Sequence, residues 1–282
     1  FGPAASGTDV PCARFLPRLT GLLSPSSERR WVSIGSNRAR PRAQRLFTVP
    51  VGTSRIAAAS ATAAPKVSAK GAFLMDASSG KTVFSKSADT KRQMASTTKT
   101  MAVAVVLDTK GVNLDKKVTV KQTYRDYVAK NGRSPADLRT GDKLTVRQLL
   151  YGTMLPSGCD AAYALADTFG SGTTVSARTK SFISKMNAKA KSLGMTNTKF
   201  DSFDGISKAG NNYSTPRDLA KLARHAMKNS TFKTVVKAAS TKQKATAKGG
   251  GTRTYTWYNT NKLLGSYKGA TGAKTGTGTA AG

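Results

Sequence analysis

The apolar positions of the chain follow a strand-like pattern at both ends of one long region and a helix-like pattern between them. Two short β-favouring runs, 72–76 and 81–84, flank a Ser-Ser-Gly turn and predict a β-hairpin. Residues 101–107 are apolar at every position, which predicts a buried helix from about Ser96 until Gly111. Between 145 and 230 apolar residues recur at helical spacing, so this stretch is predicted to be mostly helical.

Local signals sharpen this picture near the C-terminal end. Thr215 and Pro216 form an N-cap and first-turn pair for a helix over 217–228. From Thr252 onward β-favouring residues return and Gly-Thr alternation follows. The order of strands, many helices and then strands predicts a sheet that is interrupted by a helical insertion.

Residues 1–65 differ from the rest of the chain. They contain nine Arg, no Lys and only two acids, and no apolar periodicity lasts there. The small-residue run at 56–65 is typical of a secretory cleavage site, but the apolar core of about 7–15 residues that a signal peptide needs is missing. We therefore expect a leader, disordered or signal-like segment outside the fold, and a folded domain over 66–282.

Composition narrows the function classes. The 282 residues include 46 Lys and Arg against 14 Asp and Glu, a formal net charge of +32 that calls for an anionic partner or setting. Charge alone does not separate nucleic acid from an anionic cell surface. One His and two Cys cannot assemble the common zinc sites, so we expect no metal and no cofactor. No run approaches the ~20 apolar residues of a transmembrane helix.

Three short motifs carry candidate chemistry. Ser96-Thr-Thr-Lys99 opens the apolar helix, Ser157-Gly-Cys159 lies in the helical stretch, and Lys274-Thr-Gly lies in the returning strands. Positions i and i+3 share a helix face, so the Lys99 amine can approach the Ser96 hydroxyl. A serine needs such a base to become a nucleophile. The amine is neutral only if its pKa falls, which burial and a second cation, here Lys274, would favour.

In this order, and with the flanking runs 155–162, 200–206 and 213–220, the motifs resemble those of penicillin-binding proteins and serine β-lactamases. The flanks are most similar to the low-molecular-weight D-alanyl-D-alanine peptidases, in particular the Streptomyces branch that carries Ser-Gly-Cys. This resemblance implies an α/β (α+β) fold of the β-lactamase/transpeptidase type: an antiparallel sheet flanked by helices, with an inserted all-helical region at about 101–200. It also implies further C-terminal strands and a closing helix beyond Gly282, so we expect a fragment.

The resemblance also implies roles. Ser96 would attack the carbonyl of the penultimate D-Ala, Lys99 would be the base, and Ser157 would relay a proton to the leaving amine. The implied substrate-binding residues are Cys159, Lys274, Thr275, Gly276 and Thr277. Backbone N–H groups of Ser96 and Thr277 would form the oxyanion hole. Cys159 departs from the Asn of the wider family, and a thiol hydrogen-bonds more weakly than an amide, which favours transfer over hydrolysis.

The function implied is a serine-type D-Ala-D-Ala carboxypeptidase/transpeptidase acting on peptidoglycan stem peptides, inhibited by β-lactams and located outside the cytoplasmic membrane. Roles in cell-wall organisation and cell shape, and peripheral contact with membrane or wall, go with it. One alternative is a serine β-lactamase, which the absence of any Glu other than Glu28 disfavours. Another is a non-catalytic basic protein that binds nucleic acid or an anionic wall polymer. We expect no nucleic acid, because the basic residues are dispersed and form no known motif.

Overall fold

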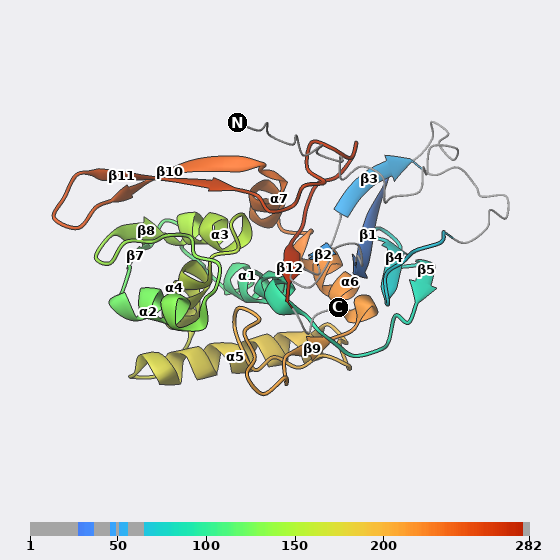
Figure 1. Ribbon diagram of the computed structural model, residues 1–282, viewed down its shortest axis with the longest axis horizontal. Coiled ribbons are helices and arrows are strands. Elements are labelled where there is room, and N and C mark those ends of the chain that lie inside the picture. The colour runs from blue at the N-terminus through green and yellow to red at the C-terminus, as the bar shows by residue number, and fades with distance from the viewer. Residues whose placement is uncertain (1–27, 37–45, 49–50, 56–64, 279–282) are drawn as a thin grey trace, which may run out of the picture.

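The computed structural model describes residues 28–36, 46–48, 51–55 and 65–278 (Figure 1). Its helices are η2 (Ala95–Thr98), α1 (Lys99–Leu107), α2 (Gln122–Asn131), α3 (Val146–Met154), α4 (Cys159–Phe169), α5 (Val175–Ser192), α6 (Pro216–Ala226) and α7 (Ser230–Lys237). Its strands are β1 (Glu28–Ser36), β2 (Leu46–Thr48), β3 (Val51–Arg55), β4 (Ala72–Asp76), β5 (Thr82–Lys86), β6 (Arg92–Gln93), β7 (Lys117–Thr119), β8 (Lys143–Thr145), β9 (Tyr213–Ser214), β10 (Ser240–Thr246), β11 (Thr252–Tyr258) and β12 (Thr275–Thr277).

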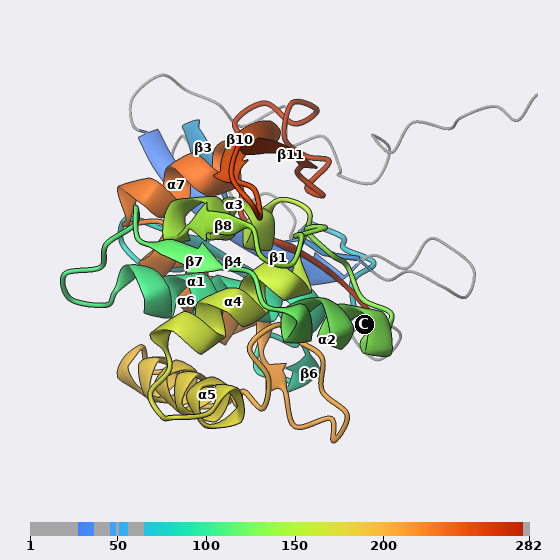
Figure 2. The same cartoon turned by 90° about the vertical axis from the view of Figure 1, so that its left-hand side faces the viewer.

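The larger sheet is antiparallel and runs in the order β12-β2-β1-β4-β5, with β3 paired to β1. The predicted hairpin is confirmed as β4 and β5. Helix α6 packs against β1 and β4, and helices α2, α3 and α4 lie on the other side of α1 from this sheet (Figures 1 and 2). Strand β12, which follows Lys274, therefore lies at one edge of this sheet, next to η2.

Helix α1 forms the centre of the molecule. All nine of its residues are buried, and it contacts α3, α4, α5, α6 and α7. A helix that is packed on every side needs apolar residues on every side, which is the pattern read at 101–107. The helix ends at Leu107, four residues before the predicted stop. It begins as the 3₁₀ turn η2, which contains Ser96.

The inserted region is largely helical, but it also contains the short strands β7 and β8. These complete a second antiparallel sheet in the order β11-β10-β8-β7. Strand β10 was not predicted, because its sequence Ser-Thr-Lys-Gln-Lys-Ala-Thr has almost no apolar residue. Full-length pairing with β11, from Ser240↔Tyr258 to Thr246↔Thr252, stabilises it instead.

Buried polar contacts hold β11 and the β10–β11 turn to the loop that precedes β8. The carboxylate of Asp142, just before β8, accepts hydrogen bonds from Tyr255 Oη (2.6 Å), Arg253 Nε (2.7 Å) and Lys248 N (3.0 Å). Burial alone would raise the pKa of Asp142, but these donors hold it below its usual value. Trp257 Nε1 donates to the carbonyl of Ala136 at 2.8 Å. The inner face of the second sheet is therefore fixed by hydrogen bonds as well as by apolar packing.

The helix predicted at 217–228 is confirmed as α6. Thr215 Oγ1 accepts the N–H of Asp218 at 3.1 Å, and Pro216 is the first helical residue. The stretch 145–230 is mostly helical, as predicted, through α3, α4, α5 and α6; its part at 193–215 forms loops and the short strand β9. No helix among the described residues combines the length and apolar character needed to cross a bilayer.

Part of the segment expected to lie outside the fold is described as strands. The backbones of β1 and β2 fill the space between β4 and β12, and β3 pairs with β1. This pairing supplies partners to N–H and C=O groups that β4 and β12 would otherwise expose at a sheet edge. The rest of residues 1–64 lies outside the described residues.

Candidate active site

The Ser96 hydroxyl and the Lys99 amine meet where η2 passes into α1. Ser96 is half-buried, whereas Lys99 is completely buried at the first position of α1. Lys99 Nζ donates to Ser96 Oγ at 3.0 Å. The three-residue spacing thus brings the pair together as predicted. A buried amine this close to a serine hydroxyl is placed to accept its proton.

Lys99 has a second acceptor in a distant loop. Its Nζ also donates to the backbone carbonyl of Asp204 at 3.0 Å. The next residue, Gly205, has φ of +98°, and a Cβ placed there would lie 1.9 Å from the carbonyl oxygen of Ala95. Only glycine allows the 204–205 peptide to pack this closely against the turn that precedes Ser96.

The Asp204 side chain strengthens this loop and adds a charge to the site. Its Oδ1 accepts the N–H of Ile206 at 3.0 Å and Tyr127 Oη at 3.2 Å. Its Oδ2 is buried and has no hydrogen-bond partner in the part of the chain that the structure describes. Burial, followed by the nearby Asp204 charge, raises the pKa of Tyr127, so its phenol stays protonated as a donor.

The Ser157-Gly-Cys motif caps the N-terminus of α4. Ser157 is 6% exposed and has φ of +66°, an uncommon conformation for a residue with a side chain. Its Oγ is buried without a hydrogen-bond partner among the described residues. The structure therefore does not bring this hydroxyl into hydrogen-bond contact with Ser96, Lys99 or Lys274.

Cys159 is the first residue of α4 and is buried. Its Sγ contacts the carbonyl of Ser157 at 3.9 Å. Burial raises the pKa of the thiol to about 12; Asp204 acts in the same direction, and Lys99 opposes it. Cys159 is therefore a protonated neighbour of Lys99 and Asp204, and not a reactive thiolate.

Strand β12 begins immediately after Lys274, the second buried lysine of the site. Lys274 is 1% exposed, and its Nζ donates to the carbonyl of Thr275 at 3.0 Å. Burial, and then the charge of Lys99, lower the pKa of Lys274 well below its usual value. Burial and the charge of Lys99 thus favour the neutral form of the Lys274 amine.

The rest of β12 lies close to η2. A Cβ on Gly276 would lie 3.0 Å from the carbonyl oxygen of Met94 and 3.2 Å from Thr97, so glycine allows the strand to approach the Ser96 turn. The hydroxyl of Thr275 shares a 2.6 Å hydrogen bond with that of Thr260. Thr277 is exposed. The strand thus offers an accessible end beside Ser96.

The structure brings together Ser96, Lys99 and the Lys274 strand, as the motif order predicted, with Cys159 beside them. It leaves the Ser157 hydroxyl unpaired. Sequence reasoning missed Asp204 and Tyr127. Asp204 lies within a run, 200–206, that carried the family resemblance, but no role could be read from it there.

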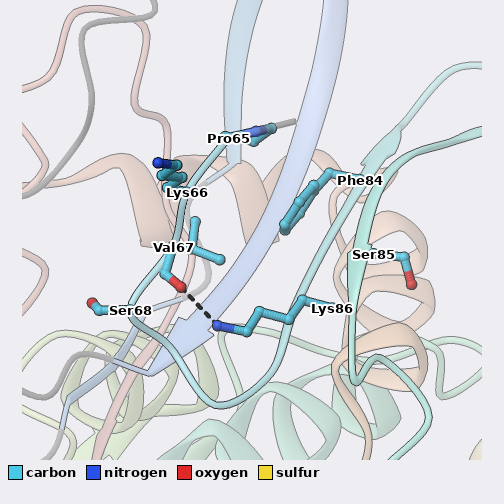
Figure 3. Close-up of a pocket in the computed structure, with 7 residues that line it drawn as sticks. All are labelled: Pro65, Lys66, Val67, Ser68, Phe84, Ser85 and Lys86. Carbon is cyan, nitrogen blue, oxygen red and sulfur yellow. Dashed lines mark hydrogen bonds between the residues drawn. The ribbon is translucent and has the colours of Figure 1, made fainter. Parts of the chain in front are cut away.

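Two further features lie away from these residues. His225 Nε2 pairs with Asp108 Oδ2 at 2.6 Å. A pocket of about 690 Å³ lies between residues 65–68 and β5, where Phe84 points toward Val67 and Lys86 Nζ donates to the Val67 carbonyl at 2.7 Å (Figure 3). It contains none of the motif residues.

The sequence is similar to those of known peptidases. Residues 58–282 match the sequence profile of a family described as D-alanyl-D-alanine carboxypeptidase. The chain is 56% identical over 228 residues to a D-alanyl-D-alanine carboxypeptidase of Streptomyces sp. (strain K15), which covers 80% of this chain and 78% of that protein. It is 32% identical over 212 residues to the D-alanyl-D-alanine carboxypeptidase DacF of Bacillus subtilis, covering 74% of this chain and 50% of that one.

Solved structures share the fold. The crystal structure of the Streptomyces K15 DD-transpeptidase superposes with a TM-score of 0.76 at 57% identity, covering 78% of this chain and 84% of that one. A D-alanyl-D-alanine carboxypeptidase of Mycobacterium tuberculosis superposes with a TM-score of 0.68 at 29% identity, covering 79% and 78%. The expected fold class is confirmed.

Proposed function

The chain belongs to the D-alanyl-D-alanine carboxypeptidase family, and from this premise we propose how its residues act on a peptide that ends in D-Ala-D-Ala. The Ser96 oxygen attacks the carbonyl carbon of the penultimate D-Ala. The C–N bond to the last D-Ala breaks, and an acyl-enzyme ester remains on Ser96. The observation that carries this assignment is the position of Lys99 Nζ, 3.0 Å from both Ser96 Oγ and the Asp204 carbonyl.

Lys99 takes the proton of the Ser96 hydroxyl as the C–O bond forms. Lys274 supports this assignment, because burial and the charge of Lys99 lower the pKa of Lys274, so the two buried amines hold two protons less readily than exposed lysines do. Ser157 gives its hydroxyl proton to the departing D-Ala amine and receives in return the proton that Lys99 took from Ser96, so both side chains are restored. Its buried, unpaired hydroxyl supports that role, since the amine of the bound substrate supplies the missing partner.

The substrate lies along β12, with its terminal carboxylate held by the Lys274 amine and the Thr275 hydroxyl. Backbone N–H groups of Ser96 and Thr277 bind the oxyanion that develops on the attacked carbonyl. Glycine at 276 supports this arrangement, because the strand passes close to the Ser96 turn there. Cys159 lies beside the acyl chain and limits its hydrogen bonding.

The acyl group is then transferred from Ser96 to water or to an amine acceptor, and the Ser96 hydroxyl is regenerated. The natural donor in this proposal is the stem peptide of bacterial peptidoglycan, so the enzyme works outside the cytoplasmic membrane, as a secreted or surface protein, and contributes to wall organisation and cell shape. A β-lactamase activity is less well supported, because the only Glu, Glu28, is distant in sequence from all three motifs.

Penicillin labelling tests the nucleophile. A β-lactam mimics D-Ala-D-Ala but keeps its leaving group tethered, so its adduct is long-lived. Mass spectrometry is expected to find one adduct, on the peptide that contains Ser96. The adduct should be lost in Ser96→Ala and retained in the matched control Ser85→Ala, an exposed serine of β5. An adduct that persists in Ser96→Ala overturns the assignment.

A further inference from the structure

The charge of this protein is distributed very unevenly along its sequence. From Leu219 to the last residue there are twelve Lys and Arg and no Asp or Glu. The structure places much of this stretch in α7, β10 and β11, along one side of the molecule (Figures 1 and 2). Among the Lys and Arg in the described part of this stretch, only Lys221 and Arg253 form ion pairs, with Asp218 and Asp142, so an external anion would stabilise the remaining cations.

The register of the second sheet shows where these cations point. Lys242 pairs with Thr256 and Lys244 with Thr254, on the face opposite to the buried Tyr255 and Trp257. Side chains alternate between faces along a strand, so both lysines project outward. Both are exposed.

The neighbouring strands continue the same outer face. Thr246 of β10 pairs with Lys143 of β8, and Lys143 pairs in turn with Thr119 of β7. Lys117 stands two residues before Thr119 and is also exposed, whereas the intervening Val118 is buried. We call the outer side of the four strands, with Lys117, Lys143, Lys242 and Lys244, the lysine face.

No carboxylate neutralises the lysine face within the described chain. None of its four lysines forms an ion pair with a described residue, and the Lys117 amine contacts only the Thr246 hydroxyl, at 3.3 Å. Asp142 is adjacent in sequence, but its carboxylate is buried on the inner side and bound by Arg253 and Tyr255. Asp115 lies at the edge, where it pairs with Arg147 at 3.6 Å.

The chemistry of the face indicates one kind of partner. Lysines at i and i+2 stand about 7 Å apart along a strand and about 5 Å from the next strand, so the face is a flat grid of cations and threonine hydroxyls. Its one large exposed aromatic residue is Tyr258, at 70% exposure. Insertion into a membrane needs several apolar side chains, and binding of single-stranded nucleic acid needs several stacking aromatics. The face offers neither.

We propose that the lysine face binds a linear phosphodiester polymer with short hydroxylated spacers, of the poly(polyol phosphate) type. Lysines pair with successive phosphates, and threonine hydroxyls bind the spacer and phosphate oxygens. The face is joined to the active site, because β11 ends at Tyr258 and Thr260 contacts Thr275 two residues later. A polymer bound to this face therefore holds β12 close to the cell wall to which the polymer is attached. This inference goes beyond the proposed catalytic function.

Cosedimentation with isolated bacterial walls that carry poly(glycerol phosphate) tests the proposal. The comparison is with the same walls after hydrofluoric acid has removed the phosphodiester polymer, over a range of salt concentrations. The intact protein should bind the first walls and largely lose binding on the second. The double variant Lys242→Gln/Lys244→Gln should bind the polymer-bearing walls more weakly, and the slope of log affinity against log salt should fall by roughly 1.5, from ~0.7–0.9 per lost phosphate contact.

The matched control is Lys180→Gln/Lys191→Gln, two exposed lysines of α5 that change the net charge equally. It should keep the slope of the parent protein. A second pair, Lys117→Gln/Lys143→Gln, repeats the test on other strands. Penicillin acylation serves as the check of folding and should be unchanged in all three variants, so a failure of binding is distinguishable from a failure of the proposed catalysis.

Three results overturn the proposal. Equal weakening by the α5 control would mean that net charge alone acts. Equal binding to stripped walls would mean that the polymer is not the ligand. Tighter binding to anionic phospholipid vesicles or duplex DNA than to soluble poly(glycerol phosphate), lost in the lysine-face variants, would assign the face to a membrane or a nucleic acid.

Discussion

Replacing Gly205 by alanine would test how the loop at 204–205 controls Lys99. The added Cβ would lie 1.9 Å from the Ala95 oxygen and 2.3 Å from its carbonyl carbon, where ordinary contacts begin at 3.4 Å. Neither atom is part of a flexible side chain, so the loop itself must move, by roughly 1 Å or more. That movement separates the Asp204 carbonyl from Lys99 Nζ, which it now contacts at 3.0 Å.

The expected effect has two parts. A side chain at positive φ costs roughly 1–2 kcal/mol by itself. Leaving the buried Asp204 carbonyl without its hydrogen-bond donor adds about 1–3 kcal/mol. Gly194→Ala is the matched control, because Gly194 also has positive φ (+65°) but has open space around its Cβ position. The control should therefore show only the first part.

The assays are urea unfolding and the second-order rate of penicillin acylation, measured on the folded protein well below its melting temperature. Gly205→Ala should lose clearly more stability than Gly194→Ala. Its acylation should slow by about 10²-fold, the usual result of misplacing a catalytic group by 1 Å. If the two variants acylate at similar rates, the Asp204 loop does not position Lys99 and the argument fails.

Four other predictions concern the buried lysines and the thiol. Lys99→Arg should slow penicillin acylation by ~10²–10⁴, because a guanidinium cannot act as a base, whereas Lys274→Arg should lose less; equal losses would contradict the separate roles. Lys274→Met should raise the free energy of unfolding in urea. The gain should narrow as pH rises toward the ordinary lysine pKa. Below that pKa, Lys274 of the unfolded wild-type chain carries a proton that it tends to lose on folding, and this cost to wild-type stability disappears as the pH rises. A gain independent of pH would count against the lowered pKa of Lys274. Cys159, with its pKa near 12, should resist iodoacetamide at pH 8 until urea is added, and rapid alkylation of the folded protein would refute its burial. Cys159→Asn should raise the ratio of hydrolysis to transfer for a D-Ala-D-Ala substrate given an amine acceptor, with acylation little changed; an unchanged ratio with slow acylation would make Cys159 a packing residue.

The sequence predicted the elements whose stability is local or whose burial is complete. The hairpin of β4 and β5 follows from its turn, α6 from its cap, and α1 from an unbroken apolar run. Strand β10 could not be found in this way. It is held by pairing with β11 and by a single ladder contact, Thr246↔Lys143, to a strand about a hundred positions earlier. Pairing at such a distance leaves no periodicity in a polar strand.

The candidate site shows the same division. Ser96, Lys99 and Lys274 could be named because their side chains are the reacting groups and their order is distinctive. The acceptor for Lys99 at position 204 is a backbone carbonyl, which every residue possesses, so no residue type reveals it. The positive φ of Ser157 is equally hidden, because serine at this conformation is held by the surrounding structure and not by its own preference.

The contact between Lys99 and Asp204 also has a consequence in time. The two residues are 105 positions apart, and a ribosome that adds ~5–20 residues per second needs roughly 5–20 s to make the chain between them. Lys274 follows later still. Throughout that interval Ser96 and Lys99 are present without the loop that contacts the Lys99 amine and without the second buried lysine. The nucleophile is therefore made before the residues that complete its surroundings.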